Sequence, residues 1–205
     1  MENQNSLKIN TIVFDMLGVL LEDAYQHIFK EIEKTENITP NSFITQIRSD
    51  LDDTLKGKIS ELELFEKIIK KFNLKINPNE LYQKVMEGFI KIDGTWEILK
   101  KLKEKNYNLI ILSNMSHNYV EEKMQKLELE KYFNEIYFSS EVGWKKPQIE
   151  FFEHILNKEN LKSEECLFID DKERNILTYE KIGIKGIIFE NPKQLEIELI
   201  KLKLL

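Results

Sequence analysis

The sequence TIVFDMLGVL, at residues 11–20, combines a run of β-branched and aromatic residues with a carboxylate and a turn. Such a run is typical of a strand that is buried on both faces of a parallel sheet. Asp15 ends the run, and Gly18 then favours a turn. Because ligands of open parallel sheets bind beyond the carboxyl ends of the strands, Asp15 lies where a nucleophile could act. Two residues later, where a second acid could assist the first, the chain has Leu17 instead.

Four more short apolar runs predict the other strands of such a sheet. Amphipathic helical patterns separate them, among them TWEILKKLKEK before the first of the four and NYVEEKMQKLEL, residues 118–129, after it. Strands that alternate with helices form parallel sheets with helices on both faces. The sequence therefore predicts an α/β fold with a Rossmann-like parallel-sheet core. The five predicted strands are residues 9–14, 109–113, 136–138, 167–169 and 186–189.

Residues 22–92 interrupt the alternation, because four successive segments have helical periodicity and none has a convincing strand pattern. Roughly 70 helical residues are too many for one crossover between parallel strands. We therefore predict a helical cap at 22–92, folded as a small bundle and inserted into a core formed by residues 1–21 and 93–205. Pro40, which lies outside the residues that the structure describes below, and Pro78 are expected to begin helices of this cap, and Gly57 with Lys58 is expected to mark a turn.

The composition favours a folded protein that does not bind nucleic acid. Hydrophobic residues make up 41% of the 205 residues, and the net charge of −6 argues against a nucleic-acid partner. No apolar run approaches the roughly 20 residues of a membrane helix, and the polar start MENQNSLKIN does not resemble a signal peptide. Cys166 is the single cysteine, so no internal disulfide can form. We therefore expect a cytoplasmic protein without membrane partners, and the oligomeric state has no signal in the sequence.

Polar side chains stand at the ends of three predicted strands. Besides Asp15, Ser113 and Asn114 end the second strand, and Asp170 and Asp171 end the fourth. Because the carboxyl ends of parallel strands meet at one edge of the sheet, we expect these side chains to converge. The segment GWKKPQIEFF also places two lysines directly before a helix, between the second and fourth strand ends along the chain.

These residue types fit phosphoryl transfer. Asp15 could attack phosphorus and form an aspartyl-phosphate. Asp170 and Asp171 could hold Mg²⁺, which prefers hard oxygen ligands and would screen the charge of the phosphate. Lys146 could neutralise the phosphate and the nucleophile, while the Ser113 hydroxyl donates to a phosphoryl oxygen.

Four segments with these polar residues follow one another along the chain, namely FDMLGVL at 14–20, IILSN at 110–114, GWKKP at 143–147 and LFIDDKERN at 167–175. With these segments the chain resembles the haloacid dehalogenase-like hydrolases, which carry four such motifs in the same order. The helical insert is similar to the cap that this family carries between its first two motifs, so the resemblance spans essentially the whole chain. Within the family, the motif sequences are most similar to the branch that contains a bacterial α-D-glucose-1-phosphate phosphatase.

The resemblance implies a role for each matching residue. The catalytic residues would be Asp15 as nucleophile with Ser113 and Lys146. Ser113, Asn114 and Lys146 would bind the substrate phosphate. The implied ligands of Mg²⁺ are Asp15, the backbone carbonyl of Leu17, Asp170 and Asp171, with Asp171 reaching the ion more directly than Asp170.

Leu17 departs from the family's phosphatases, which commonly carry a second aspartate at this position as general acid and base. Loss of such a group typically costs about 10²–10⁴-fold in rate. One explanation is a substrate with a good leaving group, such as an anomeric sugar phosphate or an acyl phosphate. Another is that Glu22 or Asp23, just past the turn, or His117, after the second motif, replaces the missing acid.

The sequence therefore predicts a Mg²⁺-dependent phosphatase that acts on a small phosphorylated metabolite, for example a sugar phosphate, through an aspartyl-phosphate. Two alternatives remain open. A C–halogen hydrolase would also lack the second acid, but the paired acids Asp170 and Asp171 argue against it. A member of the family that binds a phosphorylated ligand or a protein without turnover is the other alternative.

The assignment of the site lysine also has an alternative, because Lys145 directly precedes Lys146.

Overall fold

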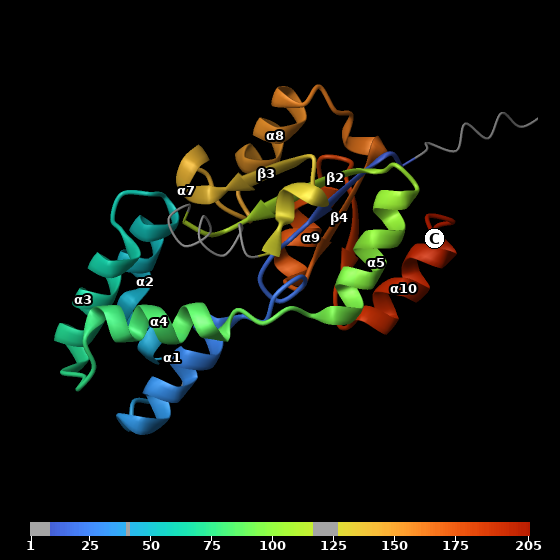
Figure 1. The fold of residues 1–205 in the computed structure, drawn as a ribbon. Helices are drawn as coiled ribbons and strands as arrows, with labels where there is room; N and C mark the ends of the chain where they lie inside the picture. The colour runs from blue at the N-terminus through green and yellow to red at the C-terminus, as the bar shows by residue number, and fades with distance from the viewer. Residues whose placement is uncertain (1–8, 40–41, 117–126) are drawn as a thin grey trace, which may run out of the picture.

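A computed structural model describes residues 9–39, 42–116 and 127–205 (Figure 1). Five strands form one sheet in the order β3-β2-β1-β4-β5, and each neighbouring pair is parallel. This topology confirms the predicted α/β fold with a Rossmann-like core. The strands are β1 Thr11–Phe14, β2 Asn108–Ser113, β3 Glu135–Phe138, β4 Cys166–Asp170 and β5 Lys185–Ile188.

Helices cover both faces of the sheet. Successive side chains of a strand point to opposite faces, so each strand contributes to two apolar clusters. On one face, Ile12 and Phe14 belong to the same buried apolar cluster as Trp96 of α5. On the other face, Val13 belongs to a second cluster that includes Phe152 of α8 and Tyr179 of α9. The covering helices are α5 Asp93–Glu104 and α10 Pro192–Lys201 on the first face, and α8 Ile149–Lys158 and α9 Glu173–Glu180 on the second.

Three shorter elements complete the description of the core. They are the 3₁₀ helices η1 Leu129–Lys131 and η2 Ser163–Glu165 and the short helix α7 Ser139–Val142. The helix expected over residues 118–129 falls largely on residues 117–126, which lie outside the described part of the chain. No helix among the described residues is long and apolar enough to cross a membrane.

The predicted helical insert consists of four helices that contact one another and stand beside the sheet (Figure 1). Local sequence explains several of their ends. Ser60 and Glu63 form a capping box at the start of α3, and Asn77 caps α4 with Pro78 in its first turn. Gly57 has a φ of 72°, so it makes the expected turn between two helices. The helices are α1 Ala24–Thr35, α2 Ser42–Leu55, α3 Glu61–Phe72 and α4 Pro78–Gly88.

The two chain segments that join the helices to the sheet run side by side. The backbone nitrogen of Glu22 donates to the Ile90 carbonyl at 2.8 Å, and that of Ile92 donates to the Leu20 carbonyl at 3.0 Å. The Trp96 indole also donates to the Leu20 carbonyl, at 2.9 Å. We therefore propose, as the sequence predicted, that the cap comprises residues 22–92.

Candidate active site

The candidate site forms at the centre of the sheet. The strand order changes direction at β1, which lies between β2 and β4, and ligands of open α/β sheets bind at such a point. Asp15 follows β1, and its backbone nitrogen donates to the Ile169 carbonyl at 2.8 Å, so the end of β4 holds it in place. Gly18 has a φ of 87°, and a β-carbon there would lie 2.7 Å from Asp171 Oδ2. Glycine is therefore required for the turn to approach the acidic pair.

Lys146 lies between two carboxylates of this centre. Its ammonium is 2.7 Å from Asp15 Oδ1 and 2.7 Å from Asp170 Oδ2, and its side chain is only 2% exposed. The amide of Asn114 fixes the backbone of Lys146, because Oδ1 accepts from its nitrogen at 2.7 Å and Nδ2 donates to its carbonyl at 3.0 Å. Asn114 thus orients the lysine, a contact that sequence reasoning did not predict.

The neighbouring lysine has a different partner. Lys145 forms an ion pair with Asp52 of α2, so it joins the core to the helical insert and does not contact the acidic centre. The structure therefore separates the two lysines that the sequence left as alternatives, and Lys146 is the one that contacts Asp15. Ser113 ends β2 beside β1 and is almost fully buried, and its contact with a phosphate remains a prediction.

Asp170 is held by several donors. Its Oδ1 accepts from the backbone nitrogen of Lys172 at 2.7 Å and from Asn175 Nδ2 at 2.9 Å, while its Oδ2 accepts from Lys146 at 2.7 Å. Asn175 Nδ2 also lies 2.9 Å from Oδ2. Both oxygens of Asp170 are thus already bound by protein groups.

Asp171 differs from Asp170 in having an oxygen without a partner. Its Oδ2 accepts from the Lys172 ammonium, but its buried Oδ1 accepts no hydrogen bond from any residue that the structure describes. Buried polar atoms without a partner are rare, and a bound ion or water is one explanation for them. Oxygen atoms of Asp15, Asp170 and Asp171 all lie within 4.8 Å of one another. These three carboxylates, called the aspartate cluster below, fit a divalent cation with hard oxygen ligands.

The aspartate cluster also perturbs proton binding. Burial raises the pKa of Asp15 to about 7, opposed by Lys146 and reinforced by Asp170. Burial also disfavours the charged form of Asp170, but Lys146 and the hydrogen bonds to its oxygens outweigh burial and lower its pKa. Burial alone would lower the pKa of Lys146, yet the two carboxylates raise it. The centre therefore keeps its lysine protonated and holds an excess of carboxylates, which favours binding of a cation.

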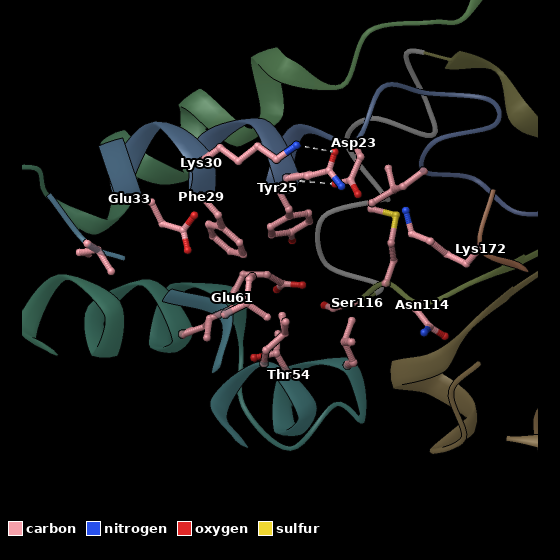
Figure 2. Close-up of a pocket in the computed structure, with 18 of the residues that line it drawn as sticks. Asp23, Tyr25, Phe29, Lys30, Glu33, Thr54, Glu61, Asn114, Ser116 and Lys172 are labelled. Atoms are coloured by element: carbon pink, nitrogen blue, oxygen red, sulfur yellow. Dashed lines mark hydrogen bonds between the residues drawn. The ribbon is translucent and has the colours of Figure 1, made fainter. Parts of the chain in front are cut away.

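A cavity of about 730 Å³ opens beside this centre, between the ends of the strands and the helices α1, α2 and α3 (Figure 2). Leu17, Asn114 and Lys172 line it on the side of the core. Glu61, the first residue of α3, lines it on the opposite side and is only 3% exposed. Burial raises the pKa of Glu61, opposed by a hydrogen bond with Ser116 of the core. Sequence reasoning missed Glu61, because an acid in the first turn of a helix is usually solvated.

The acids proposed as substitutes at Leu17 lie in different surroundings. Glu22 is half exposed and lies 4.0 Å from His27, on the surface. Asp23 lines the cavity, and its side chain caps α1 by accepting from the Gln26 nitrogen at 3.0 Å. His117 lies outside the described residues.

A parallel sheet with an aspartate cluster at its carboxyl edge, beside an inserted helical bundle, defines the chain as an α/β enzyme with a covered site. The family described as haloacid dehalogenase-like hydrolase matches residues 12–189. The chain therefore belongs to this family of hydrolases, as the four motifs predicted.

Several curated relatives are named as phosphatases. A phosphorylated carbohydrates phosphatase of Thermotoga maritima is 24% identical over 87% of this chain and 84% of its own length. A chloroplast flavin mononucleotide hydrolase of Arabidopsis thaliana is 28% identical over 68% of this chain. The match spans 56% of the Arabidopsis protein, little more than half of its length.

Solved structures share the fold at low sequence identity. A haloacid dehalogenase family enzyme from Bacteroides thetaiotaomicron is 22% identical and superimposes with a TM-score of 0.73 over 90% of this chain and 95% of that one. The same enzyme in complex with magnesium and inorganic phosphate is 21% identical, with a TM-score of 0.68 over 89% and 95% of the two chains. These likenesses establish a common fold.

Proposed function

We propose that this hydrolase is a Mg²⁺-dependent phosphatase that hydrolyses the phosphate monoester of a small molecule through an aspartyl-phosphate on Asp15. The observation that carries the proposal is the contact of Lys146 with both Asp15 and Asp170, beside the unpaired Oδ1 of Asp171. A lysine at this place can balance the charge of a nucleophilic carboxylate and of an incoming phosphate. The relatives named as phosphatases and the magnesium and phosphate complex of the Bacteroides enzyme support the same reading.

Asp15 is the proposed nucleophile. Both hydrogen bonds that the described residues donate to its side chain end on Oδ1, from the Met16 nitrogen at 2.6 Å and from Lys146 at 2.7 Å. Oδ2 is therefore the oxygen available to attack phosphorus. As the new oxygen–phosphorus bond forms, the bond to the leaving oxygen breaks and that oxygen takes the electron pair. Water then attacks the aspartyl-phosphate, which releases inorganic phosphate and restores the Asp15 carboxylate.

Mg²⁺ would be held by Asp15, Asp171 and the Leu17 carbonyl, and it would screen the charge of the phosphate. Asp170 would act mainly through Lys146, because its oxygens are already bound by Lys146, Asn175 and a backbone nitrogen. The family resemblance also implies that Asp171 reaches the ion more directly than Asp170. The unpaired Oδ1 of Asp171 supports this order.

We expect Asp171→Asn to weaken Mg²⁺ binding by at least about 10-fold, because it removes a charged ligand. Asp170→Asn should weaken it less, since that side chain already binds three protein donors. The measurement is the rise in melting temperature with added Mg²⁺, which reports binding without turnover. Equal losses in the two variants, or a larger loss in Asp170→Asn, would refute the ranking.

The assay that tests the phosphatase itself is hydrolysis of a panel of aryl, alkyl, sugar and acyl phosphates, with Mg²⁺ and with EDTA. We expect turnover that EDTA removes and Mg²⁺ restores. Absence of turnover on the whole panel would refute the proposed function and favour a member of the family that only binds its ligand.

Leu17 predicts how the rate depends on the leaving group. Because leucine cannot donate a proton, the leaving oxygen departs with negative charge, and the rate should fall steeply as the pKa of the leaving alcohol rises. A series of substituted phenyl phosphates, assayed under conditions where chemistry limits the rate, measures this slope. A flat dependence would mean that another acid supplies the proton, and Asp23 and Glu61, which both line the cavity, would be the first to replace.

A further inference from the structure

The cavity has two chemically different ends. At the core end, Leu17, Asn114 and Lys172 line it next to the aspartate cluster. Its remaining length lies between α1, α2 and α3 of the insert (Figure 2). A substrate whose phosphate reaches Asp15 would therefore place its leaving group in this space. The volume of about 730 Å³ lies within the range of roughly 300–1,000 Å³ that is typical of sites for drug-sized molecules.

Most of the surface that faces the cavity is apolar, although polar and charged side chains such as Lys30 and Glu33 also line it. Tyr25 and Phe29 of α1 direct their rings into it, opposite Glu61 and Thr54 (Figure 2). Ile44 of α2 also lines the cavity and is 38% exposed, so an apolar group there is left for a ligand to cover. Further apolar side chains of α2, α3 and the loop after β2 line the cavity, among them Leu51, Leu64 and Met115.

An apolar wall of this kind discriminates between classes of leaving group. A sugar would lose hydrogen bonds to water wherever its hydroxyl groups face the apolar part of the wall, which is unfavourable. An aromatic body would instead bury apolar surface and could pack its ring against Tyr25 and Phe29. The wall thus favours aromatic over carbohydrate groups.

Leu17 connects the shape of the cavity with the chemistry. Its side chain lines the cavity at the core end, two residues from the proposed nucleophile. It extends the apolar wall up to the reacting centre, where an acid would otherwise donate a proton. An aromatic alcohol needs less help of this kind, because its oxyanion is delocalised into the ring and leaves more easily than an alkoxide.

Glu61 is the buried carboxylate among the polar side chains that line the cavity. Its carboxyl is buried, and burial raises its pKa while a hydrogen bond with Ser116 opposes that effect. Lysines also line the cavity, namely Lys30, Lys34 and Lys172, so charges of both signs surround the ligand. The charge of the lining therefore does not select the leaving group, and the apolar surface does.

From these features we infer that the cavity binds the leaving group of an aryl phosphate, a bulky aromatic alcohol, in preference to a sugar. The inference rests on the phosphatase function proposed above and specifies the substrate class of the same site. Apolar contacts with α1 and α2 provide the selectivity, and Leu17 provides the preference for a leaving group that departs without protonation.

The test compares 2-naphthyl phosphate with phenyl phosphate and with α-D-glucose 1-phosphate, in Mg²⁺. The two aryl esters have leaving groups of similar acidity, so a difference between them reports the apolar cavity. One additional methylene group in an apolar pocket is worth about 10–200-fold, so we expect kcat/KM for the naphthyl ester to exceed that for the phenyl ester by at least about 10-fold. The glucose ester should be the poorest of the three.

Ile44 and Leu62 provide matched variants. Both are exposed helical residues of the insert, 38% and 40% exposed, but only Ile44 lines the cavity. Ile44→Asn should lower kcat/KM for the naphthyl ester by about 3–10-fold and reduce its advantage over the phenyl ester. Leu62→Asn should leave both values unchanged. Equal effects of the two variants would overturn the assignment of the cavity.

The outcomes separate this inference from the function on which it rests. Turnover of α-D-glucose 1-phosphate that equals or exceeds that of the naphthyl ester would overturn the inference and leave the phosphatase intact. If no ester is hydrolysed, the proposed function fails, and calorimetric binding of the naphthyl and phenyl esters to the wild-type protein in Mg²⁺ then tests the cavity alone. Equal affinity for the two esters in that measurement would overturn the inference as well.

Discussion

Asp15→Asn is expected to abolish phosphatase activity, with a loss on the order of 10⁴-fold or more, because the amide cannot attack phosphorus. The change is nearly isosteric and removes a charge whose burial is unfavourable, as the raised pKa of Asp15 indicates. The variant should therefore keep the fold. The measurement is kcat on the best aryl phosphate of the panel, together with the circular dichroism spectrum and the melting temperature.

The residue that carries the covalent phosphate during turnover is a second measurement of the nucleophile. Wild-type protein quenched with acid during turnover should carry one phosphate on the peptide that contains Asp15, and Asp15→Asn should carry none. Substantial turnover by a folded Asp15→Asn protein, or phosphate on another residue, would mean that the nucleophile lies elsewhere.

Lys146→Met is expected to cause the largest loss of stability among the site variants. It leaves the carboxylates of Asp15 and Asp170 buried without their cation, and breaking a buried ion pair from one side costs about 3–5 kcal/mol. Activity should also fall on the order of 10²–10³-fold, because the variant lacks the charge that stabilises the transferring phosphoryl group. Urea unfolding at constant pH measures the loss of stability, and kcat/KM measures the loss of activity.

Lys145→Met is the matched control, since it removes the same charge from the adjacent position. Its partner Asp52 and its own side chain are both partly exposed, and ion pairs of this kind contribute about 0–1 kcal/mol. The control should therefore unfold within about 1 kcal/mol of the wild type and keep its activity. Similar losses in the two variants would contradict the assignment of Lys146 as the lysine of the site.

The destabilisation caused by Lys146→Met should also grow with pH. In the variant, Asp15 and Asp170 lack their cation, so burial raises both folded-state pKa values above those of the unfolded chain. Such groups lose folding stability as pH rises and they must ionise. In the wild type, Lys146 lowers the pKa of Asp170, so that group adds stability as pH rises through the acid range. The pKa of Asp15 is raised to about 7 in the wild type as well, so ionisation of Asp15 costs some stability there, but Lys146 opposes this rise and keeps the loss smaller than in the variant. Urea unfolding at pH 5 and pH 8 should therefore show that the free energies of unfolding of the wild type and the variant differ more at pH 8.

Local patterns were enough to predict the fold and the place of the site. Strands of a covered parallel sheet are rich in apolar residues, so the five runs marked the five strands within two residues. Asp15 follows β1, Asp170 ends β4 and Asp171 follows it, and a parallel sheet brings such ends to one edge. The helical periodicity of 22–92 likewise predicted the four helices α1 to α4 of the insert.

The roles of neighbouring residues depended on tertiary contacts. Lys145 and Lys146 are the same residue type at adjacent positions, but opposite directions of their side chains give one a partner in α2 and the other a partner at β1. Asp170 and Asp171 are also adjacent, and only packing decides that the first is bound by protein donors while the second keeps an oxygen unpaired.

Glu61 shows most clearly what local sequence leaves open. Glu61 and Glu63 both lie in the first turn of α3, where acids are favoured by the helix dipole. Glu63 completes the capping box, as its spacing from Ser60 predicts. Glu61 is buried because the insert packs over the loop after β2, which is about 55 residues away along the chain. The sequence determined strands, helices and the acidic strand ends, because these follow from short-range periodicity. The cavity and its apolar character arise only when α1, α2 and α3 meet the ends of the sheet, because burial is a property of segments far apart in the chain.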